Sequence, residues 1–112
     1  MTLVNSIPDN KKLLVIFRME PGSLGPEGKE YINDFCDFAQ LQLQACASEY
    51  IILSIQPRLD KALAEMEFQV FSKKLSRDKA NQYLNLFAEN LTHFEEQLED
   101  NLEAMINQYF GR

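Results

Sequence analysis

The sequence predicts an α+β fold, a two-layer sandwich in the order β-α-β-β-α with helices on one face of a small mixed three-stranded sheet and a long C-terminal helix. Three observations support it. Two short apolar runs, Lys12–Met19 and Tyr50–Gln56, are rich in residues that favour strands. Two longer segments, Glu27–Ala47 and Asp78–Phe110, have helical periodicity. A segment near Met66, before the last helix, alternates apolar and polar side chains.

The first two strands are expected to be parallel, because the helix between them supplies the right-handed crossover that parallel strands need. In the third strand, Met66, Phe68 and Val70 alternate with polar residues, which is typical of a strand with one solvated face. A turn at 57–61 makes this strand antiparallel, and we expect it to end at 72–74. The sheet should therefore have three strands and exposed edges.

The first helix carries one apolar stripe, which leaves Gln40 and Gln44 toward its polar side. The stripe consists of Ile32, Phe35, Cys36, Ala39, Leu43 and Cys46. Cys36 and Cys46 would lie ~15 Å apart along such a helix, which is too far for a disulfide. We therefore expect two buried, reduced thiols, consistent with a cytoplasmic protein.

The C-terminal segment 76–110 is expected to be helical, with Ser76 as its N-cap. An apolar seam follows steps of three and four residues, at Leu84, Phe87, Leu91, Phe94 and Leu98. Thr92 and Glu95 have the spacing of a capping box, so the helix is expected to be either continuous or broken near Asn90. A continuous helix would be ~50 Å long and would extend beyond strands of ~20–27 Å.

Such an overhang would have no apolar surface of its own sheet to cover. The sequence therefore predicts a homodimer in which the C-terminal segment contacts the second copy. The apolar residues that continue along this segment are the expected interface, namely Leu98, Leu102, Met105 and Tyr109.

Residues 1–11 form a turn-rich lead-in, in which Leu3–Ile7 is a candidate for a short extra strand. No repeat, linker or low-complexity tract divides the chain, so residues 1–112 are expected to fold as a single domain. The apolar run Leu13–Phe17 has only five residues, too few for a signal peptide or a membrane-spanning helix. We expect a soluble, cytoplasmic protein with no membrane partner.

The net charge of −6 is concentrated near the C-terminus. Residues 80–112 contain six acidic residues and one basic residue, a balance of −5, whereas residues 1–79 have a balance of −1. Nucleic-acid binding requires basic surfaces that displace phosphate counterions, so nucleic acid is not an expected partner. The acidic helix either keeps the protein soluble or faces a basic surface of a protein partner.

The most distinctive stretch is a loop in which Gly22, Gly25 and Gly28 recur at every third position before Lys29. It lies between a strand and a helix, where backbone amides can hold an anion. Its spacing matches neither the Walker A motif nor the dinucleotide-binding motif, and Glu30 follows the lysine where a Walker motif has serine or threonine. The alternative is a tight structural connection whose glycines need positive φ.

A ligand site is predicted where the two parallel strands end, because ligands favour that edge of α/β sheets. The turn at 57–61 should lie beside the glycine loop there, bringing together Arg18, Glu20, Ser23, Gly25 and Arg58. Arg58, with Lys61 nearby, would then clamp a small acidic ligand or the acidic group of a partner. The alternative is that Arg58 forms a surface ion pair with Glu20 or Asp60.

Catalytic and metal chemistry have little support. His93 is the only histidine, nothing pairs it with a nucleophile, and no cluster has metal-ligand spacing, so no catalytic residue, metal or cofactor is predicted. The leading hypothesis is a small non-enzymatic binding protein, a homodimer that uses its acidic C-terminal helix. The alternatives are a small-ligand or minor enzymatic site at the Arg18/Glu20/Gly25/Arg58 edge, and an acidic inhibitor of a basic enzyme.

Overall fold

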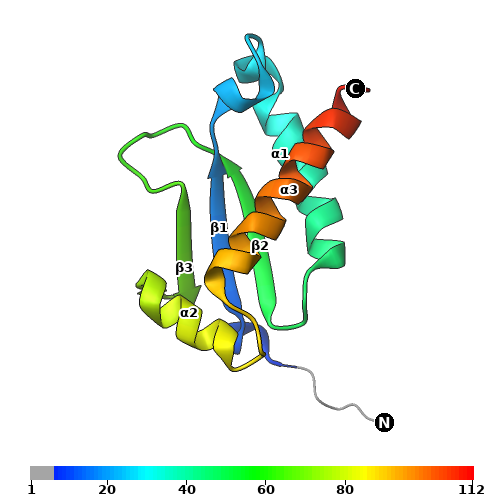
Figure 1. Ribbon diagram of the computed structural model, residues 1–112. Helices are drawn as coiled ribbons and strands as arrows, with labels where there is room; N and C mark the ends of the chain where they lie inside the picture. The colour runs from blue at the N-terminus through cyan, green and yellow to red at the C-terminus, as the bar shows by residue number, and fades with distance from the viewer. Residues whose placement is uncertain (1–6) are drawn as a thin grey trace.

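A computed structural model describes residues 7–112 of the chain (Figure 1). The strands and helices follow in the order β1 (Leu13–Met19), α1 (Gly28–Cys46), β2 (Ile51–Pro57), β3 (Met66–Val70), β4 (Lys73–Leu75), α2 (Arg77–Asn85) and α3 (Leu91–Tyr109). Short 3-10 turns, η1 (Asp9–Lys11) and η2 (Pro21–Leu24), precede and follow β1. Of the strand suggested at Leu3–Ile7, only Ile7 lies in the described residues, and it is not part of a strand.

The four strands form one mixed sheet in the order β2-β1-β3-β4. β1 lies between β2, with which it pairs in parallel, and β3, with which it pairs antiparallel (Figure 1). In this register Val15 lies between Leu53 and Phe68. The predicted α+β fold, with helices packed on a sheet, is confirmed. β1, α1 and β2 each begin and end within one residue of the expected bounds.

The sheet has one more strand than the sequence predicted. After β3, Phe71 and Ser72 have positive φ values of 56° and 62°, and this two-residue turn allows β4 to pair antiparallel with β3. The N–H of Phe71 donates to the carbonyl of Asn10 over 3.1 Å, which holds the turn against η1. Turns of this type usually contain asparagine or glycine, so nothing in the local sequence indicated the hairpin.

Buried side chains of the sheet and of all three helices form one hydrophobic core within residues 7–112. Alternate residues of β1 and β2 point into it, as expected for strands whose side chains alternate between faces. Its members include Leu13, Val15, Phe17, Ile51, Leu53, Ile55 and Phe68 from the sheet, and Ile32, Phe35, Ala39, Ala80, Leu84, Leu98 and Leu102 from the helices. The second face of the sheet, which carries Ile16 and Arg18, is not part of this core.

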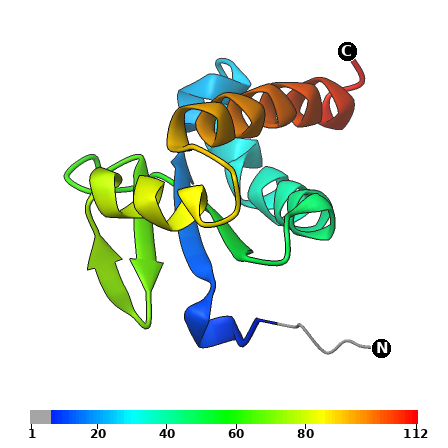
Figure 2. The same ribbon diagram turned by 60° about the horizontal axis from the view of Figure 1, so that its bottom comes forward.

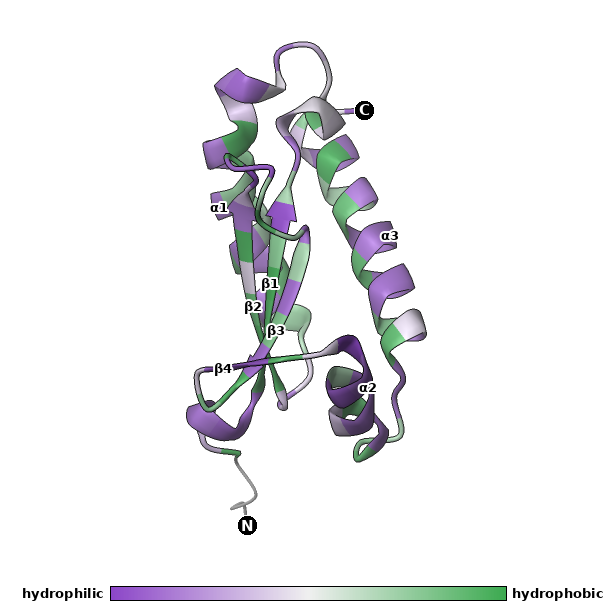
Figure 3. Cartoon of the chain, turned by 90° about the vertical axis from the view of Figure 1, so that its left-hand side faces the viewer, coloured by the Kyte–Doolittle hydropathy of each residue, from purple (hydrophilic) through white to green (hydrophobic). Residues whose placement is uncertain are grey.

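The C-terminal segment is broken into two helices. Ala88 has a positive φ of 60°, and the side chain of Asn90 caps α3 by accepting a hydrogen bond of 2.8 Å from the N–H of His93. The cap is therefore Asn90 rather than Thr92. α2, which is mainly hydrophilic, lies below α3 (Figure 3). Because α3 has only 19 residues and packs into the core, the helical overhang expected of a continuous helix does not form.

The two edges of the sheet are protected in different ways. At the β2 edge, the side-chain amides of Gln40 and Gln44 bond to backbone groups of Ile51, Leu53 and Ile55 over 2.8–3.3 Å. The two glutamines, which we expected toward the polar side of α1, therefore take the place of a neighbouring strand. The opposite edge is β4, a three-residue strand that lies far from α1 (Figure 2).

The two cysteines are both free, but only Cys36 is buried. Burial, with a smaller contribution from the charge of Asp37, raises the pKa of the Cys36 thiol to about 11. Cys46, in the last turn of α1, is exposed, which contradicts the expectation that both thiols are buried. The apolar stripe ends before the helix does.

Candidate functional site

The carboxyl ends of β1 and β2 bring the loops that follow them side by side. Met19 lies opposite Pro57 in the parallel register, and the N–H of Arg58 donates to the carbonyl of Met19 over 2.8 Å. The start of the loop 58–65 therefore lies next to Glu20 and η2. The topology places these segments together as expected for parallel strands.

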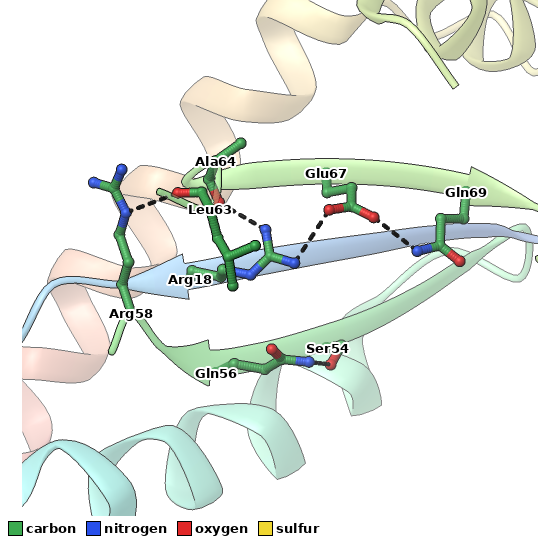
Figure 4. Close-up of polar contacts among 8 residues, drawn as sticks. All are labelled: Arg18, Ser54, Gln56, Arg58, Leu63, Ala64, Glu67 and Gln69. Atoms are coloured by element: carbon green, nitrogen blue, oxygen red, sulfur yellow. Dashed lines mark hydrogen bonds and ion pairs between the residues drawn. The ribbon is translucent and has the colours of Figure 1, made fainter. Parts of the chain in front are cut away.

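The side chain of Arg58 holds the conformation of its own loop. Nη1 of Arg58 forms an ion pair of 2.8 Å with Glu20, Nε donates to the carbonyl of Leu63 over 3.2 Å, and Nη2 donates to that of Lys61 over 3.1 Å (Figure 4 shows the contact with Leu63). Arg58 thus forms the ion pair with Glu20 that was the alternative to a ligand-clamping role. A guanidinium has five N–H groups, so Arg58 retains donors that these three contacts do not use.

Arg18 lies on the second face of the sheet, and only 8% of it is exposed. Its Nη1 donates to the carbonyl of Ala64 over 2.7 Å, and its Nη2 forms an ion pair of 3.1 Å with Glu67 (Figure 4). Hydrogen bonds from the Gln69 amide and from Arg18 lower the pKa of Glu67 below its ordinary value. Arg18 does not line the hollow at the Arg58 loop.

A depression of about 580 Å³ lies beside Arg58 at the end of the parallel strands. We call it the basic depression, because three of its residues are cationic and only one is acidic. It is lined by Glu20, Pro21, Gly22, Lys29, Ile32, Asn33, Arg58, Leu59 and Lys61. Within residues 7–112, Lys29 and Lys61 form no ion pair.

Lys29 is the cationic lining residue that the sequence-based site lacked. It belongs to the first turn of α1, directly after the last glycine of the loop. The crossover geometry is the signal that could have placed it, because α1 begins at the same sheet edge at which β1 ends.

Ser23 and Gly25 do not line the basic depression. Ser23 borders a smaller hollow of about 160 Å³ on the α3 side of η2, together with Glu20, Glu65, Glu99 and Glu103. Gly25 has a φ of 107°, a conformation that other residues rarely adopt, and its carbonyl accepts the N–H of Gly28 over 3.0 Å.

The glycine loop is a tight connection, but of its three glycines only Gly25 has the positive φ that this interpretation expected. At Gly28, an added Cβ would lie 1.7 Å from the carbonyl oxygen of Pro21, so no other residue fits there without moving the backbone. Gly22 has neither a positive φ, as Gly25 has, nor a close contact that would exclude a Cβ, as Gly28 has. Gly25 and Gly28 therefore fix where α1 begins, and with it the position of Lys29.

The expected interface residues contact the chain's own core. Leu98 and Leu102 are 4% and 3% exposed, and Met105 and Tyr109 are half-buried against the same cluster. The ring of Tyr109 packs edge-to-face on Phe35, with centroids 5.6 Å apart. The exposed side chains of α3 include four acidic ones, Glu96, Glu99, Asp100 and Glu103.

Some kinds of site have no counterpart in the part of the chain that the structure describes. Among residues 7–112, no group of three or more His, Cys, Asp or Glu side chains could hold a metal ion. No helix there has both the length and the apolar character needed to cross a membrane. Comparison with known protein families, curated proteins and solved structures finds no match.

Proposed function

We propose that the protein is a small binding module that receives an acidic segment of a partner protein in the basic depression. The observation that carries the proposal is the convergence of Lys29, Arg58 and Lys61 on one hollow in a chain with a net charge of −6. Lys29 comes from the start of α1, whereas Arg58 and Lys61 come from the loop after β2. The three charges are therefore neighbours only in the folded chain.

The charges of the depression favour an anionic partner. Lys29 and Lys61 have no acidic partner within residues 7–112, and Glu20 is already paired with Arg58. Carboxylates of a partner would therefore complement the lysines without displacing an existing ion pair. Such complementarity increases association rates and specificity more than it increases affinity.

Apolar surface next to the lysines favours a protein segment over a small inorganic anion. Leu59, which lines the depression, is 77% exposed, and Leu63 in the same loop is 46% exposed. A phosphate ion would leave both leucines in water, whereas a peptide with acidic and apolar side chains would bury them. We therefore infer a partner segment that combines both kinds of residue.

The loop that presents these leucines is held in place from two sides. Arg58 bonds to the carbonyls of Lys61 and Leu63, and Arg18 bonds to the carbonyl of Ala64. A loop that is ordered before binding loses less conformational entropy when the partner docks. This preorganisation supports a binding role for the loop.

The test is an NMR titration of the ¹⁵N-labelled protein with an acidic peptide that contains leucine. We expect saturable shifts at Lys29 and in the loop 58–65, and weaker binding of the same peptide with alanine in place of leucine. The double variant Lys29→Gln/Lys61→Gln should bind about tenfold more weakly, because each exposed ion pair contributes up to ~1 kcal/mol.

The matched control is Lys73→Gln/Lys74→Gln, which removes the same charge from β4 at the far edge of the sheet. It should bind the peptide like the wild type. An equal loss of peptide affinity in both double variants would mean that only the net charge of the protein matters, and would contradict the proposed site. Tighter binding of inorganic phosphate than of the peptide would assign the depression to a small anion instead.

The homodimer is the second candidate, because one chain carries both halves of a complementary contact. The exposed carboxylates of α3 on one copy could dock in the basic depression of another. Light scattering at low salt should then give the mass of a dimer, which falls to that of a monomer at high salt. The Lys29→Gln/Lys61→Gln variant should be monomeric at both salt concentrations. A monomer at low salt, at the highest soluble concentration, would remove this candidate.

A further inference from the structure

A separate hollow of about 600 Å³ lies between the start of α1 and the end of α3. We call it the aromatic hollow, because three of its seven lining residues are aromatic. It is lined by Leu24, Pro26, Glu27, Tyr31, Tyr109, Phe110 and Arg112. None of these residues lines the basic depression, so the two hollows are separate surfaces.

The aromatic rings of this hollow form one fixed cluster. Phe110 packs edge-to-face against Tyr31, with centroids 5.7 Å apart, and against Tyr109, with centroids 5.1 Å apart. Tyr109 is itself packed edge-to-face on Phe35 in the core. Rings arranged in this way offer faces and edges to a further planar group at little conformational cost.

Arg112 is held over this cluster by the end of α3. Gly111 has a φ of 70°, its N–H donates to the carbonyl of Gln108 over 3.2 Å, and the N–H of Arg112 donates to that of Asn107 over 2.7 Å. These two bonds are the Schellman motif, which ends many helices with a left-handed glycine. The guanidinium carbon of Arg112 lies 4.9 Å from the ring centroid of Phe110, a cation–π contact.

One acidic and one basic side chain border the aromatic hollow. Glu27 is exposed at the N-cap position of α1, and Arg112 is exposed beyond the end of α3. Neither side chain forms an ion pair within residues 7–112. The hollow therefore offers an unpaired carboxylate and an unpaired guanidinium beside an apolar aromatic wall.

We propose that the aromatic hollow binds a small zwitterion with a planar ring, that is, an aromatic amino acid. The ring would pack on Tyr31, Tyr109 and Phe110, the carboxylate would pair with Arg112, and the ammonium group would pair with Glu27. The volume lies within the range of about 300–1,000 Å³ that is usual for small-molecule sites. This site does not depend on the function proposed for the basic depression.

The test compares three ligands that share one ring system, by NMR titration of the full chain. The ligands are L-tryptophan, indole-3-propionate, which lacks the ammonium group, and tryptamine, which lacks the carboxylate. Tryptophan should bind most tightly and shift the amides of Tyr31, Phe110 and Gly111. Each ligand with one charge should bind roughly threefold to fivefold more weakly, as expected for loss of one exposed ion pair.

Two charge-removing variants of exposed residues make the assignment specific. Arg112→Gln should weaken the binding of tryptophan and indole-3-propionate and leave tryptamine unchanged. Glu27→Gln should weaken the binding of tryptophan and tryptamine and leave indole-3-propionate unchanged. Controls outside the hollow, Lys73→Gln and Glu96→Gln, should change none of the three affinities.

Three results would overturn the proposal. They are the absence of saturable shifts with any of the ligands, saturable shifts located away from the aromatic hollow, and variants that alter all three affinities equally. Because Lys29, Arg58 and Lys61 do not line the aromatic hollow, the Lys29→Gln/Lys61→Gln variant should bind tryptophan like the wild type.

Discussion

Arg18 and Arg58 were both placed at one ligand site by the sequence, and the structure gives them different surroundings. Arg18 is buried on the second face of the sheet, where an ion pair with Glu67 balances its charge. Arg58 is only partly buried and lies at the end of the parallel strands, with an ion pair to Glu20. The side chains of both donate to carbonyls of the loop 58–65, from the sheet face and from the sheet edge respectively (Figure 4).

Burial therefore decides what each arginine contributes to the protein. When a buried guanidinium is removed by substitution, a carboxylate and a carbonyl lose their donor. Leaving these groups unpaired away from water lowers the free energy of unfolding substantially. When a partly exposed guanidinium is removed, water can hydrogen-bond to the groups that it contacted. We therefore expect Arg18 to act on the stability of the whole domain and Arg58 to act on the order of one loop.

The largest expected effect is that of Arg18→Met. Methionine retains the apolar stem but leaves Glu67 and the carbonyl of Ala64 without their donor, which should cost about 2–3 kcal/mol of unfolding free energy. For a domain of this size, the melting temperature should fall by roughly 10 °C in calorimetry. A fall no larger than that of Arg58→Met would contradict the role assigned to burial.

Glu67→Gln should have a smaller effect that depends on pH. The folded state lowers the pKa of Glu67, so its charge stabilises the protein above the ordinary carboxylate pKa, and this contribution is lost as the pH falls through the folded-state value. The free energy of unfolding of the wild type should exceed that of the variant by about 1 kcal/mol near neutral pH, and the difference should shrink from neutral to acidic pH. Denaturant unfolding across that range measures this difference, and a value independent of pH would contradict a role for the ionised carboxylate.

Arg58→Met should reduce stability by less than about 1 kcal/mol, because its ion pair with Glu20 is partly solvated. Its main effect should be on the loop 58–65, which loses two of its side-chain contacts. Hydrogen exchange should become faster at Leu63 while remaining slow at core strand amides such as that of Val15. Unchanged exchange in the loop would contradict a role of Arg58 in ordering it.

The smallest effect on stability is expected for Lys29→Gln/Lys61→Gln, within about 0.5 kcal/mol of the wild type, because neither lysine is paired within residues 7–112. The thermal transition of this variant checks the expectation. Together with weaker peptide binding, unchanged stability would separate the residues that hold the loop from those that contact a partner.

Much of the fold could be predicted from local patterns. Continuous apolar runs identified β1 and β2, an apolar stripe identified α1, and alternation identified β3, since each burial pattern repeats within a short stretch of chain. The parallel pairing of β1 and β2 followed from the crossover rule. The same rule placed Arg58 beside Glu20.

Other features depend on contacts between distant segments. Gln40 and Gln44 looked like residues of a polar helix face, yet they bond to the edge of β2. The hairpin to β4 has a bulky residue, Phe71, in a left-handed conformation, although such residues usually avoid that conformation. No local pattern contains this information, because the partner groups are supplied by other parts of the chain.

Sequence patterns were sufficient to predict the succession of β1, α1, β2 and β3 and the sheet edge at which their loops meet. These depend on periodic burial and on chain connectivity, which are both local properties. Three other features depend on the folded chain: Arg18 lies on the second face of the sheet, Lys29 lies near Arg58 and Lys61, and Leu98 and Leu102 fill the chain's own core. The charge and burial around such side chains are set by neighbours distant in sequence, and folding is what brings these neighbours together.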